Sequence, residues 1–188
     1  MSEHVAPTVP APTRSHMRTR VLGIALALGV IALDQGTKAL ALANLSETER
    51  IPLLGDWFGL QLAFNTGASF SLGSESTLLI SILGIVVSIG LVVAIWRTSS
   101  AIWAAGFGLV LGGAVGNIID RFVAAPGWGR GPVTDFLAYG SLFIGNVADV
   151  IIGVGIGVMA IAVLRRPAKA DAVAEAAPST PAGGEPRD

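Results

Sequence analysis

Acidic and amide side chains stand at several points where the chain is otherwise strongly apolar. The stretch FIGNVADVIIGVGIGVMAIAVL, residues 143–164, is apolar enough to cross a bilayer, yet it contains Asn146 and, three residues later, Asp149. The stretch GGAVGNIIDRF repeats this spacing with Asn117 and Asp120. A carboxylate within an apolar span is costly unless a neighbouring group compensates it. We therefore expect Asp149 to take part in a functional site.

Other polar side chains stand near the ends of further apolar segments. Asp34 and Lys38 are four residues apart, so on a helix they share one face, and we expect them to form a structural ion pair. Asn65 precedes a glycine turn at Gly67, and Asp135 stands in PVTDFL. The expected topology brings these groups to one layer near the outer membrane boundary.

The residue types present limit the chemistry that this layer can perform. The chain has no cysteine, which excludes disulfides and thiolate nucleophiles, and its two histidines both lie early, at His4 and His16. We therefore expect no metal site and no cofactor. Two acids that share a site hold one proton between them, because like charges separate their pKa values. One acid then activates water while the other polarises a carbonyl group, as in aspartic proteases.

The composition indicates a membrane protein. Of the 188 residues 52% are hydrophobic and 13% are charged, whereas about a quarter of a soluble domain is charged. The net charge of −1 gives no indication of a nucleic-acid partner. Apolar segments near the ~20 residues that a spanning helix needs occur at 21–43, 76–96, 101–119 and 142–164. We predict an all-α integral membrane protein with four transmembrane helices.

Charge asymmetry predicts how these helices are oriented. Basic residues gather before the first span, between the second and third, and after the fourth: Arg14, Arg18, Arg20, Arg97, Arg165, Arg166 and Lys169. The positive-inside rule places both termini in the cytoplasm and the loops 44–75 and 120–141 outside. The near-alternation of WFGLQLAFN, Trp57–Asn65, predicts a strand in a small β-rich platform between the first two helices.

The remaining parts of the chain have simpler interpretations. Residues 1–20 and 167–188 are rich in Ala, Pro, Thr and charge, and we expect disordered tails around a membrane domain at 21–166. Glycines spaced by four predict close packing between helices: Gly108, Gly112 and Gly116, and likewise Gly153 and Gly157.

Five segments together resemble the signature blocks of the lipoprotein signal peptidase (signal peptidase II) family. They are DQGTK (34–38), NTGASFSLG (65–73), GGAVGNIIDR (112–121), VTDF (133–136) and NVADVII (146–152). They occur in the family's order and span residues 34–152, which is essentially the whole membrane domain. One block alone would be a weak signal, whereas five in order are a strong one.

The resemblance implies a bacterial inner-membrane aspartic endopeptidase. Such an enzyme cleaves the signal peptide of a prolipoprotein immediately before a cysteine that carries a diacylglyceryl group. By the motifs, Asp135 and Asp149 would be the catalytic dyad. The positions that would support the dyad or bind substrate are Asp34, Lys38, Asn65, Gly67, Asn117, Asp120, Arg121 and Asn146. The expected partners are lipidated prolipoproteins and membrane lipids, and we expect a monomer.

Two departures and three alternatives accompany this hypothesis. Gly145 stands where the family usually has an aromatic residue, and VAAPGWGRGP (123–132) is longer than usual. A transporter or proton channel would use the aspartates as a relay, but a relay should cross the membrane. A structural subunit would not require Asp135 and Asp149. A signal peptide cleaved after Ala43 is disfavoured by the charges before that site.

The topology is open to direct test. Reporter fusions at about residue 60 and about residue 130 should report an external location, because the positive-inside rule places both loops outside. A fusion after Arg166 should report an internal one. An external C-terminus would contradict the orientation and move the acids to the wrong side.

Overall fold

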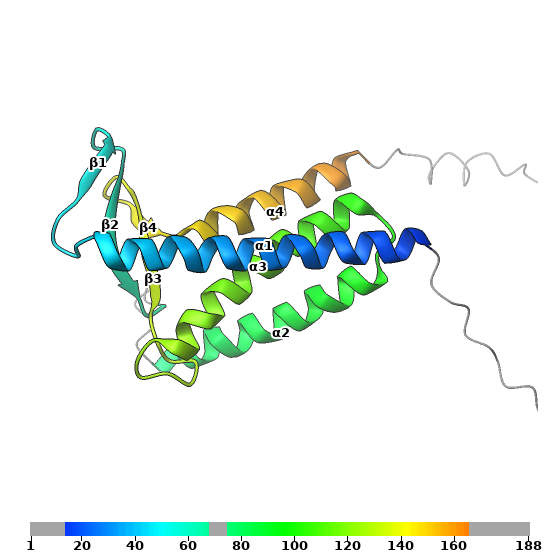
Figure 1. Cartoon of the computed structure of the whole chain (residues 1–188), viewed down its shortest axis with the longest axis horizontal. Coiled ribbons are helices and arrows are strands. Elements are labelled where there is room, and N and C mark those ends of the chain that lie inside the picture. Colours follow the sequence, from blue (N-terminus) through cyan, green and yellow to red (C-terminus); the bar gives the residue numbers. More distant parts are fainter. Residues whose placement is uncertain (1–13, 68–74, 166–188) are drawn as a thin grey trace, which may run out of the picture.

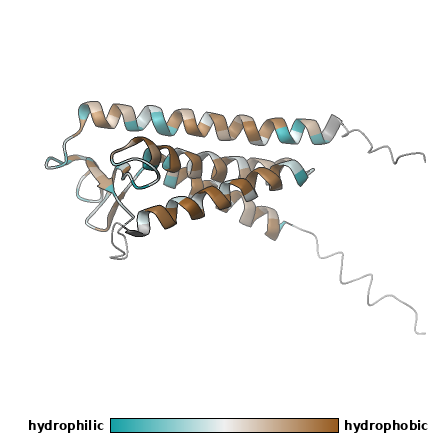
Figure 2. Ribbon diagram, turned by 90° about the horizontal axis from the view of Figure 1, so that it is seen from below, coloured by the Kyte–Doolittle hydropathy of each residue, from teal (hydrophilic) through white to brown (hydrophobic). Residues whose placement is uncertain are grey.

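Four long helices account for most of the computed structural model, which describes residues 14–67 and 75–165. They are α1 (Arg14–Asn44), α2 (Glu75–Arg97), α3 (Ala101–Val123) and α4 (Val147–Leu164). Each contains a segment that is long and apolar enough to cross a membrane. Figure 2 shows apolar residues along most of the length of these helices. The prediction of four such helices is confirmed, while both predicted tails lie largely outside the described residues.

Helix α3 is the centre of the bundle, because it packs against each of the other three helices. Figure 1 shows α2 and α4 on opposite sides of α3. Glycine makes this packing close: a Cβ atom on Gly112 would lie 2.7 Å from the Ala27 carbonyl oxygen of α1. A Cβ atom on Gly113 would lie 2.8 Å from the Ala148 oxygen of α4. The predicted close packing of the α3 glycines is therefore confirmed.

The second predicted glycine pair behaves differently. A Cβ atom on Gly153 or Gly157 would meet no atom within 4 Å in the described part of the chain. The prediction that these two glycines pack against a helix of the same chain is wrong. Helix α4 instead contacts α3 through Gly155, where a Cβ would lie 3.0 Å from the Gly106 carbonyl oxygen.

An antiparallel sheet lies at one end of the bundle (Figure 1). Its strands are β1 (Ile51–Leu54), β2 (Phe58–Asn65), β3 (Val133–Tyr139) and β4 (Phe143–Gly145), in the order β1-β2-β3-β4. The strand predicted at Trp57–Asn65 is confirmed as β2. A core of Ala41, Leu62 and Phe136 joins the sheet to the end of α1.

The sheet differs from the predicted platform in its origin. β1 and β2 come from the connection between α1 and α2, but β3 and β4 come from the connection between α3 and α4. The all-α description with a platform from the first loop alone is therefore incomplete. Each of the two connections supplies two strands, and β2 pairs with β3 across them to form one sheet. The pattern within either connection alone does not show this pairing.

Three boundaries also shift. Helix α4 begins at Val147 and not at residue 142, because Phe143 pairs with Tyr139 in the sheet and stacks on its ring at 4.8 Å. Helix α1 begins at Arg14, inside the predicted tail. Helix α3 continues to Val123, so residues 120 and 121 belong to the helix and not to the outer loop.

The contact between α1 and α3 can be tested with a minimal substitution. Gly112→Ala should lower the free energy of unfolding by about 1–3 kcal/mol, because the added methyl group overlaps the backbone and Val30 of α1. Gly29→Ala on α1 is the matched control, since its Cβ meets nothing within 4 Å. Thermal unfolding in detergent measures both, and equal unfolding temperatures would contradict the packing argument.

Candidate active site

A buried lysine lies at the centre of the polar groups. Lys38 on α1 is 3% exposed, and its Nζ lies 2.8 Å from Asp34 Oδ2 and 2.9 Å from Asp120 Oδ2. The same Nζ donates to Asn117 Oδ1 at 2.9 Å. An ammonium group has three N–H donors, so these three partners use all of them. The predicted pair of Asp34 and Lys38 is confirmed, and Asp120 completes it as a triad.

The two carboxylates of this triad also hold the backbone of other elements. Asp34 Oδ1 accepts a hydrogen bond from the backbone N–H of Ala148, in the first turn of α4, at 3.2 Å. Asp120 Oδ2 accepts one from the backbone N–H of Thr134 in β3 at 2.9 Å. The triad therefore fixes where α4 and β3 begin relative to α1 and α3.

Gln35 belongs to this cluster, although the sequence analysis did not select it. Its Nε2 donates to Asp120 Oδ1 at 3.0 Å and to Asp34 Oδ2 at 3.2 Å. Its position three residues before Lys38 on the same helix was the signal that could have identified it.

Asn117 connects Lys38 to Asp149. Because Lys38 can only donate, the oxygen of the Asn117 amide must face it, and the Nδ2 group then faces away. That Nδ2 donates to Asp149 Oδ1 at 3.0 Å. The orientation of the amide is therefore determined by the ammonium group.

Asn146 connects the two acids of the predicted dyad. It is the N-cap of α4 and forms a capping box with Asp149, in which the Asn146 side chain accepts from the Asp149 N–H. The Asn146 backbone N–H donates in return to Asp149 Oδ2 at 3.1 Å. Its side-chain Nδ2 donates to Asp135 Oδ1 at 2.6 Å. One residue thus holds both carboxylates.

Asp135 lies in the middle of the sheet and is 2% exposed. The pKa of its carboxyl group is raised from 3.8 to about 6, chiefly by burial and to a smaller extent by the negative charge of Asp149, while hydrogen bonds from Asn146 and Asn65 and the positive charge of Lys38 oppose the rise. Asn65 is held in place because its Oδ1 accepts from the Gly67 N–H at 2.8 Å. Asp135 therefore keeps a proton at a higher pH than an ordinary aspartic acid.

Gly67 and Arg121 lie beside each other at the same end of the bundle. Gly67 has φ of +96°, a conformation that favours glycine, and a Cβ there would lie 4.0 Å from Arg121 Nη2. Arg121 is 7% exposed, and its buried Nη1 has no hydrogen-bond partner among the described residues. Its charge interacts with those of Asp135 and Asp120.

A cavity of about 340 Å³ opens beside Asp135. It is lined by Ala63, Phe64, Asn65, Thr66, Asp135, Phe143 and Ile144. The Phe143 ring also lies 3.5 Å from the point that a Cβ on Gly145 would occupy. The aromatic ring of Phe143, two residues earlier in β4, thus lies close to the position at which the sequence analysis noted a missing aromatic side chain.

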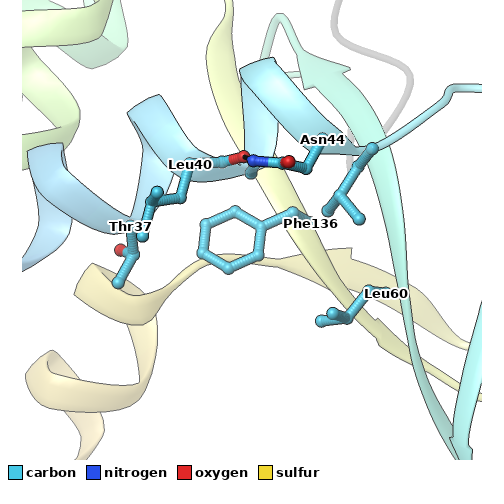
Figure 3. Close-up of a pocket in the computed structure, with 7 residues that line it drawn as sticks. Thr37, Leu40, Asn44, Leu60 and Phe136 are labelled. Atoms are coloured by element: carbon cyan, nitrogen blue, oxygen red, sulfur yellow. Dashed lines mark hydrogen bonds between the residues drawn. The ribbon is translucent and has the colours of Figure 1, made fainter.

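A second cavity, of about 360 Å³, lies between α1 and the sheet (Figure 3). Phe136 from β3 and Leu60 from β2 face Thr37, Leu40 and Asn44 of α1. None of its lining residues has a titratable side chain. The cavity beside Asp135 is therefore the better candidate for a reaction site.

The structure brings the predicted site residues together at the sheet end of the bundle. Direct contacts join Asp34, Lys38, Asn117, Asp120, Asn146, Asp149 and Asp135 into one network. Asn65, Gly67 and Arg121 adjoin it, while the motif residues 68–73 lie outside the described residues. Within residues 14–67 and 75–165, no group of three or more His, Asp or Glu side chains is arranged to hold a metal ion.

The comparisons with known proteins agree on one family. The family model described as signal peptidase (SPase) II matches residues 26–165. The lipoprotein signal peptidase of Leifsonia xyli is 42% identical over 160 residues, which are 83% of this chain and 73% of that protein. The lipoprotein signal peptidase of Rhodococcus jostii is 44% identical over 143 residues, 76% of this chain and 71% of that protein.

A solved structure supports the fold. A bacterial membrane enzyme determined by the in meso method at 1.9 Å resolution matches with a TM-score of 0.68. The match covers 77% of this chain and 93% of that chain, at 24% sequence identity. The arrangement of four helices and a sheet therefore occurs in a known membrane enzyme.

The triad predicts a large effect of removing its cation. Lys38→Met leaves Asp34 and Asp120 buried without a counter-charge, which should lower the free energy of unfolding by about 3–5 kcal/mol. Arg97→Met, at an exposed arginine in the last turn of α2, is the control and should change little. Thermal unfolding and the yield of folded protein measure both, and similar values for the two variants would contradict the role given to Lys38.

Proposed function

The chain belongs to the signal peptidase II family and cleaves the signal peptides of prolipoproteins, and on that premise we propose that Asp135 and Asp149 are its catalytic dyad. The cut falls immediately before the diacylglyceryl-modified cysteine. The other predicted residues support the dyad or contact substrate, and Asp120 acts as a support because Lys38, Gln35 and Thr134 already occupy its oxygens.

The observation that carries this proposal is the bridge made by Asn146. Its backbone and side chain donate to Asp149 and Asp135 respectively, so the two carboxylates are held on either side of one residue. Two acids held in this way share a proton, which is the arrangement that aspartic peptidases require. The exposed Asp149 and the cavity beside Asp135 give water and a peptide access to both groups.

The hydrogen bonds assign different roles to the two acids. Both oxygens of Asp149 accept N–H groups, from Asn117 and from the Asn146 backbone, which hold the carboxylate in place at the exposed side of the site. Asp135 is buried and its pKa is raised to about 6, so it is the acid that carries the shared proton. Asp149 is then the general base, and Asp135 is the general acid.

The reaction follows from these roles. Asp149 takes a proton from water, and the water oxygen attacks the carbonyl carbon of the scissile peptide bond. Asp135 donates its proton to the carbonyl oxygen, which gives a neutral tetrahedral intermediate. When the intermediate collapses, Asp135 recovers that proton, Asp149 passes its proton to the leaving nitrogen, and the C–N bond breaks.

The location follows from the family and the helices. The chain is a multi-pass protein of the bacterial inner membrane, and we place both termini in the cytoplasm and the dyad near the extracytoplasmic face, as the charge distribution predicts. Its partners are lipidated prolipoproteins and membrane lipids, and it acts as a monomer without a cofactor. A transporter is not favoured, because Asp34, Asp120 and Asp149 gather at the sheet end and do not form a path along the helices.

The dyad is tested by three substitutions that preserve shape. Asp135→Asn and Asp149→Asn should each lower kcat at least about a hundredfold, because each removes one proton transfer. Asp120→Asn should retain measurable turnover. The assay is cleavage of a lipidated prolipoprotein by the purified proteins in detergent or vesicles. If the Asp135→Asn variant still cleaves the substrate while the Asp120→Asn variant shows no turnover, Asp120 is the partner of Asp149.

The pH dependence of cleavage tests the role of Asp135. Its pKa is raised from 3.8 to about 6, so the protonated form is lost as the pH rises through about 6, and kcat/KM should fall in that range. Asn65 donates to the charged form of Asp135 and lowers this pKa. Asn65→Leu should therefore move the fall in kcat/KM to higher pH. A shift to lower pH would contradict the assignment.

A further inference from the structure

The segment 123–132, which is longer than is usual in the family, forms a closely bonded loop that joins α3 to β3. The Gly127 N–H donates to the Ala124 carbonyl oxygen at 2.7 Å. The Gly131 N–H donates to the Arg121 carbonyl oxygen at 3.0 Å and so ties the end of the loop back to α3. Because its backbone is held by these bonds, the loop presents its side chains in fixed directions.

The loop carries a tryptophan in an unusual backbone conformation. Trp128 has φ of +56°, in the left-handed region that is unfavourable for a bulky residue. Its neighbours Gly127 and Gly129 have φ of +77° and +79°, values that glycine adopts readily. Gly129 is buried against the bundle, whereas Trp128 is 86% exposed. The loop thus accepts backbone strain and leaves a large aromatic ring uncovered, which points to a role for this ring at a surface outside the chain.

The loop is attached to α2 inside the apolar span of that helix, and Figure 1 shows it beside the start of α2. Ser81 Oγ donates to the Gly129 carbonyl oxygen at 2.6 Å. A Cβ on Gly129 would lie 3.3 Å from the Ser81 Cβ, so the loop backbone touches the helix. Ser81 comes four residues after Thr77, where the span begins, which is about 6 Å along the helix. Trp128, one residue before Gly129, therefore stands close to the level at which this span enters the hydrocarbon.

The side chains near Trp128 suit a membrane surface. Val123, the last residue of α3, is 79% exposed, and Phe122 before it is 44% exposed. Arg130 is exposed two residues after Trp128. Tryptophan combines an apolar ring with an N–H donor and is enriched where hydrocarbon meets headgroups, while arginine can place its charge among lipid phosphates. Apolar, aromatic and basic groups thus occur together at the sheet end of the bundle.

We propose that the loop 123–132 is an interfacial anchor, which places the indole ring of Trp128 among the phospholipid headgroups at the sheet end of the bundle. The partner is the lipid bilayer, because one ring on a narrow loop is far smaller than the roughly 800 Å² per partner that a stable protein interface buries. The loop joins α3, which carries Asp120, to β3, which carries Asp135, so the anchor sets the depth of this end of the chain in the bilayer. This inference goes beyond the proposed function and does not depend on which acids are catalytic.

Fluorescence quenching measures the depth of Trp128. The chain has four tryptophans, so Trp57→Phe, Trp96→Phe and Trp103→Phe together leave Trp128 as the only one. The purified protein is placed in phosphatidylcholine vesicles whose acyl chains carry bromine either near the headgroup or near the methyl end. Bromine near the headgroup should quench the emission at least about twofold more than bromine near the methyl end, because an interfacial ring lies at headgroup level. Acrylamide in the water should quench the emission less than it quenches a free tryptophan derivative.

The attachment of the loop to α2 has a matched control on the same helix. Ser81→Ala removes the donor to the Gly129 oxygen, so the loop is no longer held on α2. Quenching by bromine should then weaken, and quenching by acrylamide should increase. Ser88→Ala removes a hydroxyl that bonds the Gly84 oxygen within its own helix and should change neither. Equal quenching of the two serine variants would overturn the role given to this attachment.

A spin label supplies an independent measurement that keeps the other three tryptophans. The chain has no cysteine of its own, so Trp128→Cys allows a nitroxide to be attached at this position alone. Oxygen, which dissolves in lipid, should relax the label more than a water-soluble nickel chelate does. A stronger effect of the chelate, with full quenching of Trp128 by acrylamide, would place the ring in water. Protection of Trp128 from bromine and acrylamide alike would place the ring against a protein or a second copy of the chain. Either outcome would overturn the proposal.

Discussion

The ammonium group of Lys38 is the interaction on which the site depends. It is buried at 3% exposure, and it is bound by two carboxylates and one amide oxygen from α1 and α3. Asp34 and Asp120 also accept hydrogen bonds from backbone N–H groups at the starts of α4 and β3. A single buried charge thus determines the relative positions of four elements, because each of its partners would otherwise be an unpaired buried polar group.

The site also uses the local geometry of a helix start. Asn146 and Asp149 form a capping box, which is an ordinary way to satisfy the first N–H groups of a helix. Here the Asn146 side chain has a second N–H, and that group binds Asp135 from the sheet. The same residues therefore stabilise α4 and align the two carboxylates, so changes at Asn146 are expected to affect folding and catalysis together.

The sheet separates two environments around adjacent residues of β3. Asp135 faces the cavity that Asn65 and Phe143 also line, whereas Phe136 faces α1 and the apolar cavity behind the sheet. Alternation along the strand gives this separation directly. The burial that it provides raises the pKa of Asp135, and the exposed position of Asp149 leaves the other acid accessible to water. The difference between the two acids thus arises from where the sheet meets α4.

The sequence by itself determined the four apolar helices, the strand at β2 and most of the polar residues that gather at the sheet end, because hydrophobic length, strand alternation and motif spacing are local properties. It also suggested the pairing of Asp34 with Lys38, which are one helical turn apart. Only the tertiary structure decided that both loops build one sheet, that α4 begins after β4, and that Gly153 and Gly157 meet no helix. These features depend on contacts between segments that are distant in the chain. The amide of Asn117 is oriented by such a contact with Lys38, and no local pattern encodes it.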